Sequence, residues 1–349
     1  VNNGHEVWVE AKAGIGSKFT DKQYSEAGAK IVYSPEEVYK AEVILKIEPP
    51  TLEEIDMMHP NQALISALQL GHLRSENIQA LMKKKVTALA YEFIEDKVGG
   101  MPIIRAMSEI AGTMVLLIAA EHLSSSNNGK GVILGGITGV PPTKVVIIGA
   151  GTVAEYAARA AIGLGAEVQV FDNHIYKLRR IKSILGQQIY TSTIDTLTLS
   201  ETLETADVVI GALRAEKGRT RHVISEEMVM RMRADSLVID LSIDQGGCIE
   251  TSEITTLSKP VFRKHGVIHY CVPNIASRVA HTATTALSNI FTPTILRAAE
   301  EGGIEEMIFS HKWFMKGVYT YKGGLTNEHV ARKFGLKYKN IDLLFAARF

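Results

Sequence analysis

The fold of this chain is decided by the stretch Lys144-Val-Val-Ile-Ile-Gly149-Ala-Gly151-Thr-Val-Ala154, in which β-branched residues lead directly into glycines. This pattern predicts a buried strand, a tight turn and the start of a helix. Gly149 permits the turn, Gly151 lets the backbone approach a ligand, and Ala154 lets the helix pack closely on the strand. The N–H groups and the dipole of such a helix end favour the phosphates of a dinucleotide.

A second apolar strand, residues 166–171, ends in Asp172, 21 residues after Gly151. An acid at this place can accept hydrogen bonds from ribose hydroxyls and would repel a 2′-phosphate, so NAD is favoured over NADP. The predicted NAD-binding residues of this region are Gly149, Ala150, Gly151, Thr152, Val153 and Asp172. The alternative is a glycine turn of another α/β fold, in which Asp172 merely caps the next helix.

A further glycine, Gly211, follows the apolar strand at residues 207–210. In the next position of the sheet it would allow the cofactor to come close to the backbone. It could equally be an ordinary glycine at a strand end, and the sequence does not separate these two interpretations.

Short apolar strands alternate with helical stretches along nearly the whole chain, which predicts an α/β protein with parallel sheets. The early strands expected are 7–10, 30–33, 42–46, 63–68 and 86–91. The later ones are 145–148, 166–171, 207–210, 236–240 and 267–272. The expected helices include 21–27, 75–84, 102–126, 276–300 and 326–334, the last being the one helix expected in the tail. Asp21 and Ser75 are the expected N-caps of the first two.

The chain of 349 residues is too long for one compact core, so two domains are expected. We expect two Rossmann-like doubly wound domains joined by long helices, with the active-site cleft between them. Residues 1–103 plus 282–349 would form the substrate (catalytic) domain, and residues 104–281 the NAD-binding Rossmann domain.

Composition narrows the classes of partner. Lysine and arginine together number 38, as do aspartate and glutamate, so no basic surplus favours nucleic acid. Two cysteines, Cys248 and Cys271, exclude a disulfide framework, fit the cytoplasm, and lack the spacing of a metal site. The longest apolar run, 114–120, is too short to span a membrane, and no signal peptide precedes the fold. Val1 at the start indicates a trimmed N-terminus.

Four segments carry a resemblance to a known family: Ala106-Met-Ser-Glu-Ile-Ala-Gly112, Gly135-Gly-Ile-Thr-Gly-Val-Pro-Pro142, Ile243-Asp-Gln-Gly-Gly-Cys248 and His269-Tyr-Cys-Val-Pro-Asn274. They resemble alanine dehydrogenases and, more distantly, the NAD-binding subunit of proton-translocating transhydrogenases. The resemblance extends to about Gly303. It implies reversible oxidative deamination of L-alanine to pyruvate and ammonia in amino-acid catabolism, with hydride transfer to NAD. It also implies homo-oligomers, often hexamers.

By position in these segments, the resemblance implies that Asp244 is the catalytic aspartate and that Ser108 and Asn274 lie near the cofactor. It further implies an arginine upstream of this chain that holds the substrate carboxylate. The alternative for Asp244 is a residue that bridges or caps helices.

On the substrate side the chain departs from the family at two places. In Lys46-Ile-Glu48-Pro-Pro50, Lys46 matches a family lysine, but Glu48 stands where a second, substrate-contacting lysine is expected. In Ser66-Ala-Leu-Gln69, Gln69 stands where the family has a histidine. Gln69 can donate a hydrogen bond to a substrate oxygen but cannot supply a proton. Lys46 could pair with Glu48 or reach the substrate carboxylate, and a surface lysine is the alternative.

The predicted catalytic residues are therefore Asp244, Gln69 and Lys46. His72 is a weaker candidate to replace the missing imidazole. His269 and His281 are expected to be satisfied by packing, and Cys248 to be a small buried thiol.

Three hypotheses remain open. The first is an NAD-dependent L-alanine dehydrogenase with an altered substrate site, and the second is an NAD-dependent dehydrogenase of another amino or 2-oxo acid. The third is a non-catalytic NAD(H)-binding protein, motivated by the loss of two substrate-facing groups at Glu48 and Gln69.

Overall fold

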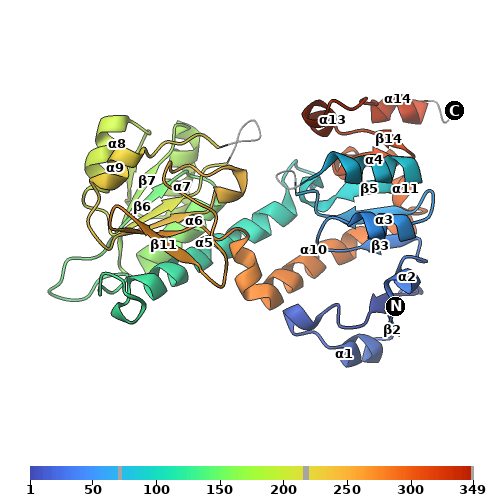
Figure 1. The fold of residues 1–349 in the computed structure, drawn as a ribbon, viewed down its shortest axis with the longest axis horizontal. Helices are drawn as coiled ribbons and strands as arrows, with labels where there is room; N and C mark the ends of the chain where they lie inside the picture. The colour runs from blue at the N-terminus through green and yellow to red at the C-terminus, as the bar shows by residue number, and fades with distance from the viewer. Residues whose placement is uncertain (70–72, 215–219, 347–349) are drawn as a thin grey trace. The chain divides into compact units, whose positions relative to one another are not determined.

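The computed structural model describes residues 1–69, 73–214 and 220–346, and the chain forms two compact units (Figure 1). Unit 1 comprises Val1–Ala106 and Val279–Phe349, and unit 2 comprises Met107–Arg278. The architecture is mixed α/β with parallel sheets, as the alternation of strands and helices predicts.

Unit 2 is built on one sheet with the strand order β11-β12-β10-β9-β6-β7-β8. Its strands are β6 (Lys144–Ile148), β7 (Glu167–Phe171), β8 (Tyr190–Ser192), β9 (Val208–Gly211), β10 (Leu237–Asp240), β11 (Val261–Lys264) and β12 (Val267–Tyr270). All pairs are parallel except β11 with β12. Apart from β11 this is the Rossmann order, and ligands of such sheets bind where the order reverses, here between β6 and β9.

The five later strands predicted from the sequence are present, while β8 and β11 were missed. Both lie at edges of the sheet and contain no fully buried residue. Edge strands of this kind lack the apolar run by which a buried strand is recognised.

Helices cover both faces of this sheet. They are α6 (Thr152–Gly163), α7 (Ile175–Leu185), α8 (Thr196–Leu203) and α9 (Glu226–Met230), with most of α5 (Pro102–Leu123) and the 3₁₀ turns Ser125–Asn127 and Ile243–Gln245. Val145 and Ile147 of β6 pack in one core cluster with α5 and α6. Val146 and Ile148 pack in the other with α8 and α9. A strand buried on both faces explains the unbroken apolar run before Gly149.

Helix α5 corrects the expectation that no segment reaches membrane-spanning length. Among the described residues it is the one helix long and apolar enough to do so. Its C-terminal half contributes Val115, Leu116, Ile118, Ala119 and Leu123 to the core of unit 2. This packing accounts for the apolar composition of that half.

Unit 1 contains a five-stranded sheet with the order β14-β13-β5-β4-β3. Its strands are β3 (Val43–Leu45), β4 (Ala63–Ser66), β5 (Thr87–Ala90), β13 (Val318–Tyr321) and β14 (Gly324–Leu325). Strands β3, β4 and β5 pair in parallel, whereas β13 is antiparallel to β5 and β14 is antiparallel to β13. Strands β1 (Trp8–Glu10) and β2 (Lys30–Val32) form a separate parallel pair. The early strands therefore do not share one sheet.

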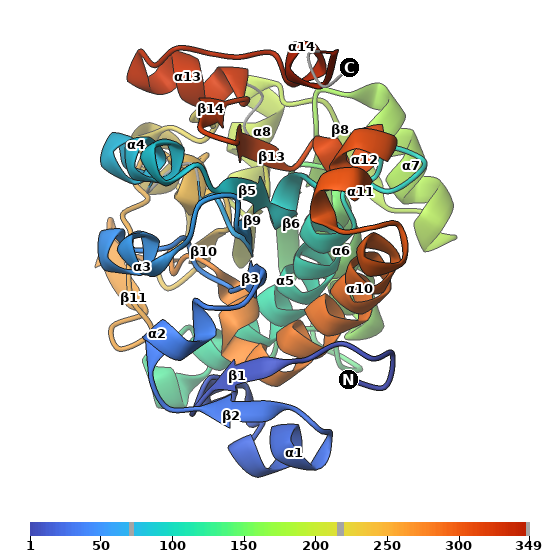
Figure 2. The same cartoon turned by 90° about the vertical axis from the view of Figure 1, so that its right-hand side faces the viewer.

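The helices of unit 1 flank this sheet. They are α1 (Asp21–Glu26), α2 (Pro35–Val38), α3 (Leu52–Met57), α4 (Ser75–Lys84), α10 (Ala280–Glu300), α11 (Ile304–Ser310), α12 (Lys312–Met315), α13 (Glu328–Phe334) and α14 (Ile341–Ala346). The 3₁₀ turns of this unit are Ile15–Ser17 and Tyr91–Phe93, and a further 3₁₀ turn, Ile275–Val279, lies at the end of unit 2 directly before α10. Figure 2 shows α3 and α4 on one side of β3 and β5, and α10, α11 and α12 on the other.

The tail was predicted to hold one helix, and this was wrong. Besides α13 it forms α12, α14 and the two antiparallel strands β13 and β14. These elements are short, so none repeats an apolar period often enough to be recognised.

Both N-cap predictions in unit 1 were wrong by one residue. Thr20 caps α1 in a capping box with Gln23, while Asp21 is the first helical residue and accepts a hydrogen bond from the N–H of Lys12. Arg74 occupies the N-cap position of α4 without a side-chain hydrogen bond.

A close helix contact in unit 2 gives a first prediction. A Cβ added at Gly112 of α5 would clash with the carbonyl oxygen of Val153 and lie 2.7 Å from the Cβ of Tyr156 in α6. We expect Gly112→Ala to cost about 2–3 kcal/mol and to lower the melting temperature by several degrees, because the two helices must separate.

The matched control is Gly163→Ala at the end of α6, where an added Cβ meets nothing within 4 Å. This change should be neutral or stabilising, by up to about 1 kcal/mol. Thermal unfolding of both variants would contradict the interpretation if Gly112→Ala were as stable as Gly163→Ala.

Candidate functional site

The glycine loop of unit 2 has the geometry of a phosphate-binding turn. Gly149 adopts a φ of +110°, and a Cβ there would lie 2.6 Å from the carbonyl oxygen of Ala212, so only glycine fits. Gly151 is the N-cap of α6 and provides no side-chain hydrogen bond to the helix. A Cβ at Gly151 would meet nothing within 4 Å. The start of α6 thus combines an uncapped end with open space, which fits the diphosphate of a dinucleotide.

Asp172, at the end of β7, lies against this loop. Its Oδ2 accepts a hydrogen bond of 2.8 Å from the N–H of Ala150. Its Oδ1 accepts one of 2.7 Å from the N–H of His174 and lies 3.0 Å from Nδ1 of the same residue. The carboxylate is only 3% exposed. The N-cap position of α7 belongs to His174, so Asp172 does not cap that helix as the alternative interpretation required.

An arginine that the sequence analysis missed also contacts the loop. Arg180 of α7 donates to the carbonyl oxygen of Ala150 at 3.1 Å and to Oε2 of Glu155 at 2.8 Å. Glu155 lies buried in the first turn of α6 and pairs also with Arg159. An acid in the first turn of a helix that is expected to bind phosphate requires a compensating cation, and this requirement was the available signal in the sequence.

Ser108 lies on α5, one turn before Gly112. Residues four apart share one face of a helix, and Gly112 faces Val153 and Tyr156 of α6. Ser108 therefore lies on the face of α5 that packs towards the first turn of α6, which holds Thr152 and Val153.

The position of Gly211 is explained by packing within the protein. A Cβ there would lie 2.5 Å from Sγ of Cys248 and 3.0 Å from Oδ1 of Asp240. These contacts require a glycine without reference to a cofactor.

The sequence analysis also missed Asp240, a fully buried carboxylate at the end of β10. Its Oδ2 accepts hydrogen bonds from the N–H groups of Cys248 at 2.9 Å and Ile249 at 3.3 Å, and from the hydroxyl of Ser252 at 2.8 Å. Its Oδ1 accepts one of 3.0 Å from the N–H of Ser242. Burial raises the pKa of Asp240 above its usual value, although these donors lower it in part. The signal in the sequence was an acid that ends an apolar strand.

Asp240 closes the loop that carries Asp244. Asp244 is exposed on the 3₁₀ turn Ile243–Gln245, between the two ends of the loop that Asp240 binds. Gly247 has a φ of +75°, and a Cβ there would lie 2.8 Å from Oδ2 of Asp240. Gly247 of the family segment is thus needed to pack the loop around the carboxylate.

Asn274 is exposed shortly after β12 and adopts a φ of +52°. This left-handed conformation is more accessible to asparagine than to most residues. The carbonyl oxygen of Asn274 accepts hydrogen bonds from the N–H and the hydroxyl of Ser277.

The remaining polar candidates of unit 2 are structural. Cys248 and Cys271 are both free and buried, and burial raises the pKa of each thiol, that of Cys271 to about 11. His269 is fully buried between the hydroxyl of Thr251 and the carbonyl oxygen of Val267, as expected of a histidine satisfied by packing. His281 belongs to unit 1, where it stacks on Phe19.

In unit 1, Lys46 does not pair with Glu48. Its Nζ lies 2.6 Å from both carboxylate oxygens of Glu54, and Glu48 is exposed. The pairing of Lys46 with Glu48 that was considered from the sequence is therefore wrong. Glu54 also forms a capping box with Thr51 at the start of α3. Burial raises the pKa of Glu54, but the hydrogen bonds from Lys46 and Thr51 bring it below its usual value.

Gln69 is exposed after β4 with a φ of +46°. Its N–H donates to Oε1 of Glu92 at 3.1 Å. His72, the suggested substitute for the missing imidazole, lies outside the described residues.

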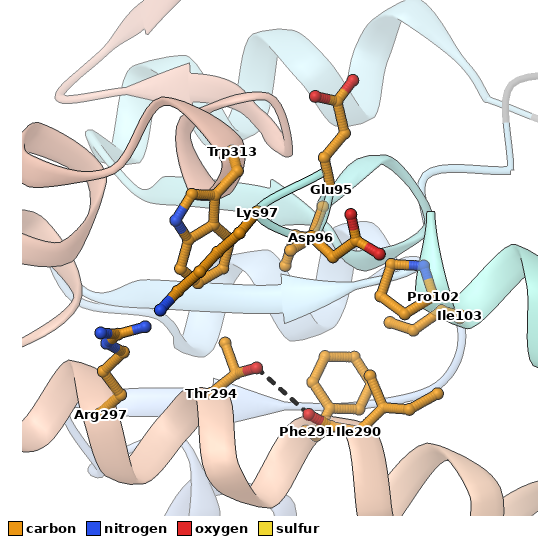
Figure 3. A pocket seen from close by; sticks show the side chains of 11 residues that line it. Glu95, Asp96, Lys97, Pro102, Ile103, Ile290, Phe291, Thr294, Arg297 and Trp313 are labelled. Atoms are coloured by element: carbon orange, nitrogen blue, oxygen red, sulfur yellow. Dashed lines mark hydrogen bonds between the residues drawn. The ribbon is translucent and has the colours of Figure 1, made fainter. Parts of the chain in front are cut away.

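A pocket of about 210 Å³ lies elsewhere in unit 1 (Figure 3). Its lining residues are Ile94, Glu95, Asp96, Lys97, Pro102, Ile103, Ile290, Phe291, Thr294, Arg297 and Trp313. The charged ends of Lys97 and Arg297 lie at the same side of the pocket, but Arg297 already pairs with Glu301 at 2.9 Å. None of the predicted site residues lines this pocket, so it does not mark the predicted site. In the described part of the chain, no three potential ligands are grouped to hold a metal ion.

Comparisons with known proteins agree with these features. The family model "Alanine dehydrogenase/PNT, C-terminal domain" matches residues 115–328, and "Alanine dehydrogenase/PNT, N-terminal domain" matches residues 1–111. The chain is 38% identical to the alanine dehydrogenase of Bacillus subtilis, covering 97% of this chain and 89% of the relative. It is 37% identical to the alanine dehydrogenase of Methanococcus maripaludis, covering 96% and 90%.

Solved structures extend the comparison. An L-alanine dehydrogenase superposes with a TM-score of 0.90 at 34% identity, covering 96% of this chain and 92% of the other. A transhydrogenase from Sinorhizobium meliloti shares the fold, with a TM-score of 0.80 at 23% identity over 94% and 91% of the two chains. This chain belongs to the alanine dehydrogenase/PNT family.

Proposed function

We propose that this protein is an NAD-dependent L-alanine dehydrogenase, which interconverts L-alanine with pyruvate and ammonia. The observation that carries the proposal is the uncapped, open end of α6 with the carboxylate of Asp172 bound to the same loop. The proposed substrate, L-alanine, comes from the relatives that are 37–38% identical to this chain, since both are named alanine dehydrogenase.

The cofactor would be held by groups of unit 2, and when bound it supplies the acceptor for the substrate hydride. The N–H groups at the start of α6 bind the diphosphate, and Asp172 accepts hydrogen bonds from ribose hydroxyls. The full proposed set is Gly149, Ala150, Gly151, Thr152, Val153, Asp172, Ser108, Gly211 and Asn274. Gly211 contributes indirectly, because its contacts with Cys248 and Asp240 fix the end of β9.

Asp244 is proposed as the acid/base group. An exposed carboxylate on a loop tied at both ends can take a proton from the substrate ammonium or from water without moving far. Gln69 donates a hydrogen bond to a substrate oxygen, and Lys46 attracts the substrate carboxylate. The contact with Glu54 weakens the attraction of Lys46 for the substrate carboxylate, because the lysine charge is already balanced.

A second candidate is a dehydrogenase of another amino or 2-oxo acid. It is favoured by the acidic residues Glu48 and Glu54 around Lys46, since these weaken the attraction of a small carboxylate. The third hypothesis, a protein that binds NAD(H) without turnover, is distinguished from these two by the assays below.

We further propose that the protein acts in the cytoplasm as a homo-oligomer, by analogy with the family a hexamer. Two free thiols without a disulfide partner are compatible with a reducing compartment. The assembly can be measured by light scattering of the purified protein.

The first test is turnover itself. Purified protein with pyruvate, ammonium and NADH should consume NADH, because the chain contains the proposed catalytic groups Asp244, Gln69 and Lys46. A panel of bulkier 2-oxo acids runs in parallel. Turnover of another acid with pyruvate inert would favour the second candidate, and NADH binding without any turnover would leave only the binding protein.

The second test concerns Asp172. Replacing it by asparagine keeps its shape but removes the charge, so NADH should bind about tenfold more weakly, a change of about 1.4 kcal/mol. Binding of NADPH should improve relative to NADH, because the repulsion of the 2′-phosphate is relieved. The control is Glu167→Gln at the opposite, exposed end of the same strand. Equal nucleotide affinities in the two variants, measured by calorimetry, would contradict the role of Asp172.

The third test concerns the loop around Asp244. Asp240→Asn places an amide against backbone N–H groups, leaving buried donors unpaired, and should cost about 2–4 kcal/mol of stability. The turnover number should fall as well, because Asp244 is then less well placed. Asp235→Asn, in the turn before the same strand, removes a partly exposed pair with Arg263 and should cost less than about 1 kcal/mol. The interpretation is wrong if both variants unfold alike.

A further inference from the structure

The carboxyl end of β4 is tied by a side chain from the neighbouring strand β5. Glu92 lies in the 3₁₀ turn Tyr91–Phe93 that follows β5, and β5 pairs with β4 in parallel up to Ser66. Oε1 of Glu92 accepts hydrogen bonds from two consecutive N–H groups, that of Leu68 at 2.7 Å and that of Gln69 at 3.1 Å. The chain beyond β4 is thus anchored by one oxygen.

This anchor falls on a residue in an unusual conformation. Gln69 has a φ of +46°, in the left-handed region that costs a residue with a Cβ about 1–2 kcal/mol. Leu68 before it is buried and cannot turn away. The hydrogen bonds from Leu68 and Gln69 to one carboxylate oxygen therefore hold Gln69 in a conformation that it would otherwise leave.

The other oxygen of Glu92, Oε2, is buried and has no hydrogen-bond partner among the described residues. The neighbouring Tyr91 does not donate a hydrogen bond to Oε2, because its hydroxyl donates to the carbonyl oxygen of Ile47 at 2.8 Å. Burial raises the pKa of Glu92, and its backbone donors lower it in part. Such a buried, incompletely satisfied acid is costly, and an apolar or amide residue would be easier to place for stability alone.

Glu92 stands beside the groups in which this chain differs from its family. Glu48 is close enough to raise the pKa of Tyr91 together with burial and with Glu92. The same strand edge carries Lys46, whose backbone N–H donates to Ile65. The carboxylate that holds Gln69 therefore lies close to the segment that carries Lys46 and Glu48.

We propose that Glu92 is a positioning residue for Gln69: its Oε1, through the N–H groups of Leu68 and Gln69, fixes the backbone from which Gln69 reaches the substrate. The inference rests on the proposed function in one respect, the contact of Gln69 with the amino or oxo acid. Glu92 itself touches no reacting atom.

The experiment compares Glu92→Ala, Glu92→Gln, Gln69→Ala and the double variant Glu92→Ala/Gln69→Ala with the full-length protein. Glu95→Gln is the matched control, since this glutamate lies on the same segment and its carboxylate points away from the pocket in Figure 3. For each protein the KM for L-alanine, the KM for NAD and kcat are measured.

We expect Glu92→Ala and Gln69→Ala each to raise the KM for L-alanine about tenfold with little change in the KM for NAD. The double variant should be no worse than either single one, because both changes remove the same contact. Glu92→Gln should stay within about threefold of the parent, since an amide oxygen accepts the same two N–H groups. Multiplying effects in the double variant would overturn the proposal, because a merely structural loss is independent of the side chain at position 69.

A second readout separates this inference from the proposed function. Hydrogen exchange of the peptide that contains Leu68 and Gln69 needs no turnover, so it remains informative if L-alanine is not the substrate. Glu92→Ala should accelerate the exchange of these two amides, while Glu92→Gln and Glu95→Gln should not. Unchanged exchange in Glu92→Ala would overturn the proposal even in a fully active enzyme.

Discussion

Carboxylates that accept backbone N–H groups beyond the ends of parallel strands hold the loops on which the candidate site is built. Asp172 binds the N–H of Ala150 in the glycine loop, Asp240 binds both ends of the loop around Asp244, and Glu92 binds the chain before and at Gln69. A carboxylate is suited to this role because it can accept several hydrogen bonds, and these bonds are strong when the carboxylate is buried. Without these anchors the sheets would remain, but the positions of the reactive side chains would not be defined.

The sequence predicts the parts of this molecule that repeat a local pattern. The strand before Gly149, the glycines themselves and the acid at Asp172 follow from one stretch, because the turn, the buried strand and the helix end each demand particular residues. Short exposed strands such as β8 and β11, and the small elements of the tail, carry too little periodicity to be recognised. The N-caps were misplaced by one residue since Thr20 and Asp21 are both suitable caps, and only the capping box with Gln23 decides between them.

The site illustrates a different limit of sequence reasoning. Asp244, Ser108, Asn274 and Lys46 come from resemblance to the family, and Gln69 comes from a departure from it. The anchoring acids Asp240 and Glu92 were missed, because their importance lies in hydrogen bonds to backbone atoms that no motif specifies. The partner of Lys46 could not be predicted from the sequence either. Glu54 is eight residues away and contacts the lysine only because the chain turns into α3 between them.

Glu54 has two roles, and the substitution by glutamine separates them. The same carboxylate that balances Lys46 also receives the N–H of Thr51, while the Thr51 hydroxyl receives the N–H of Glu54. Alanine at this position would free the lysine and also fray the first turn of α3, whereas glutamine would free the lysine and keep the cap, as Gln23 does at the start of α1. This edge of the sheet can therefore become more basic by one substitution, without a new cap for the helix.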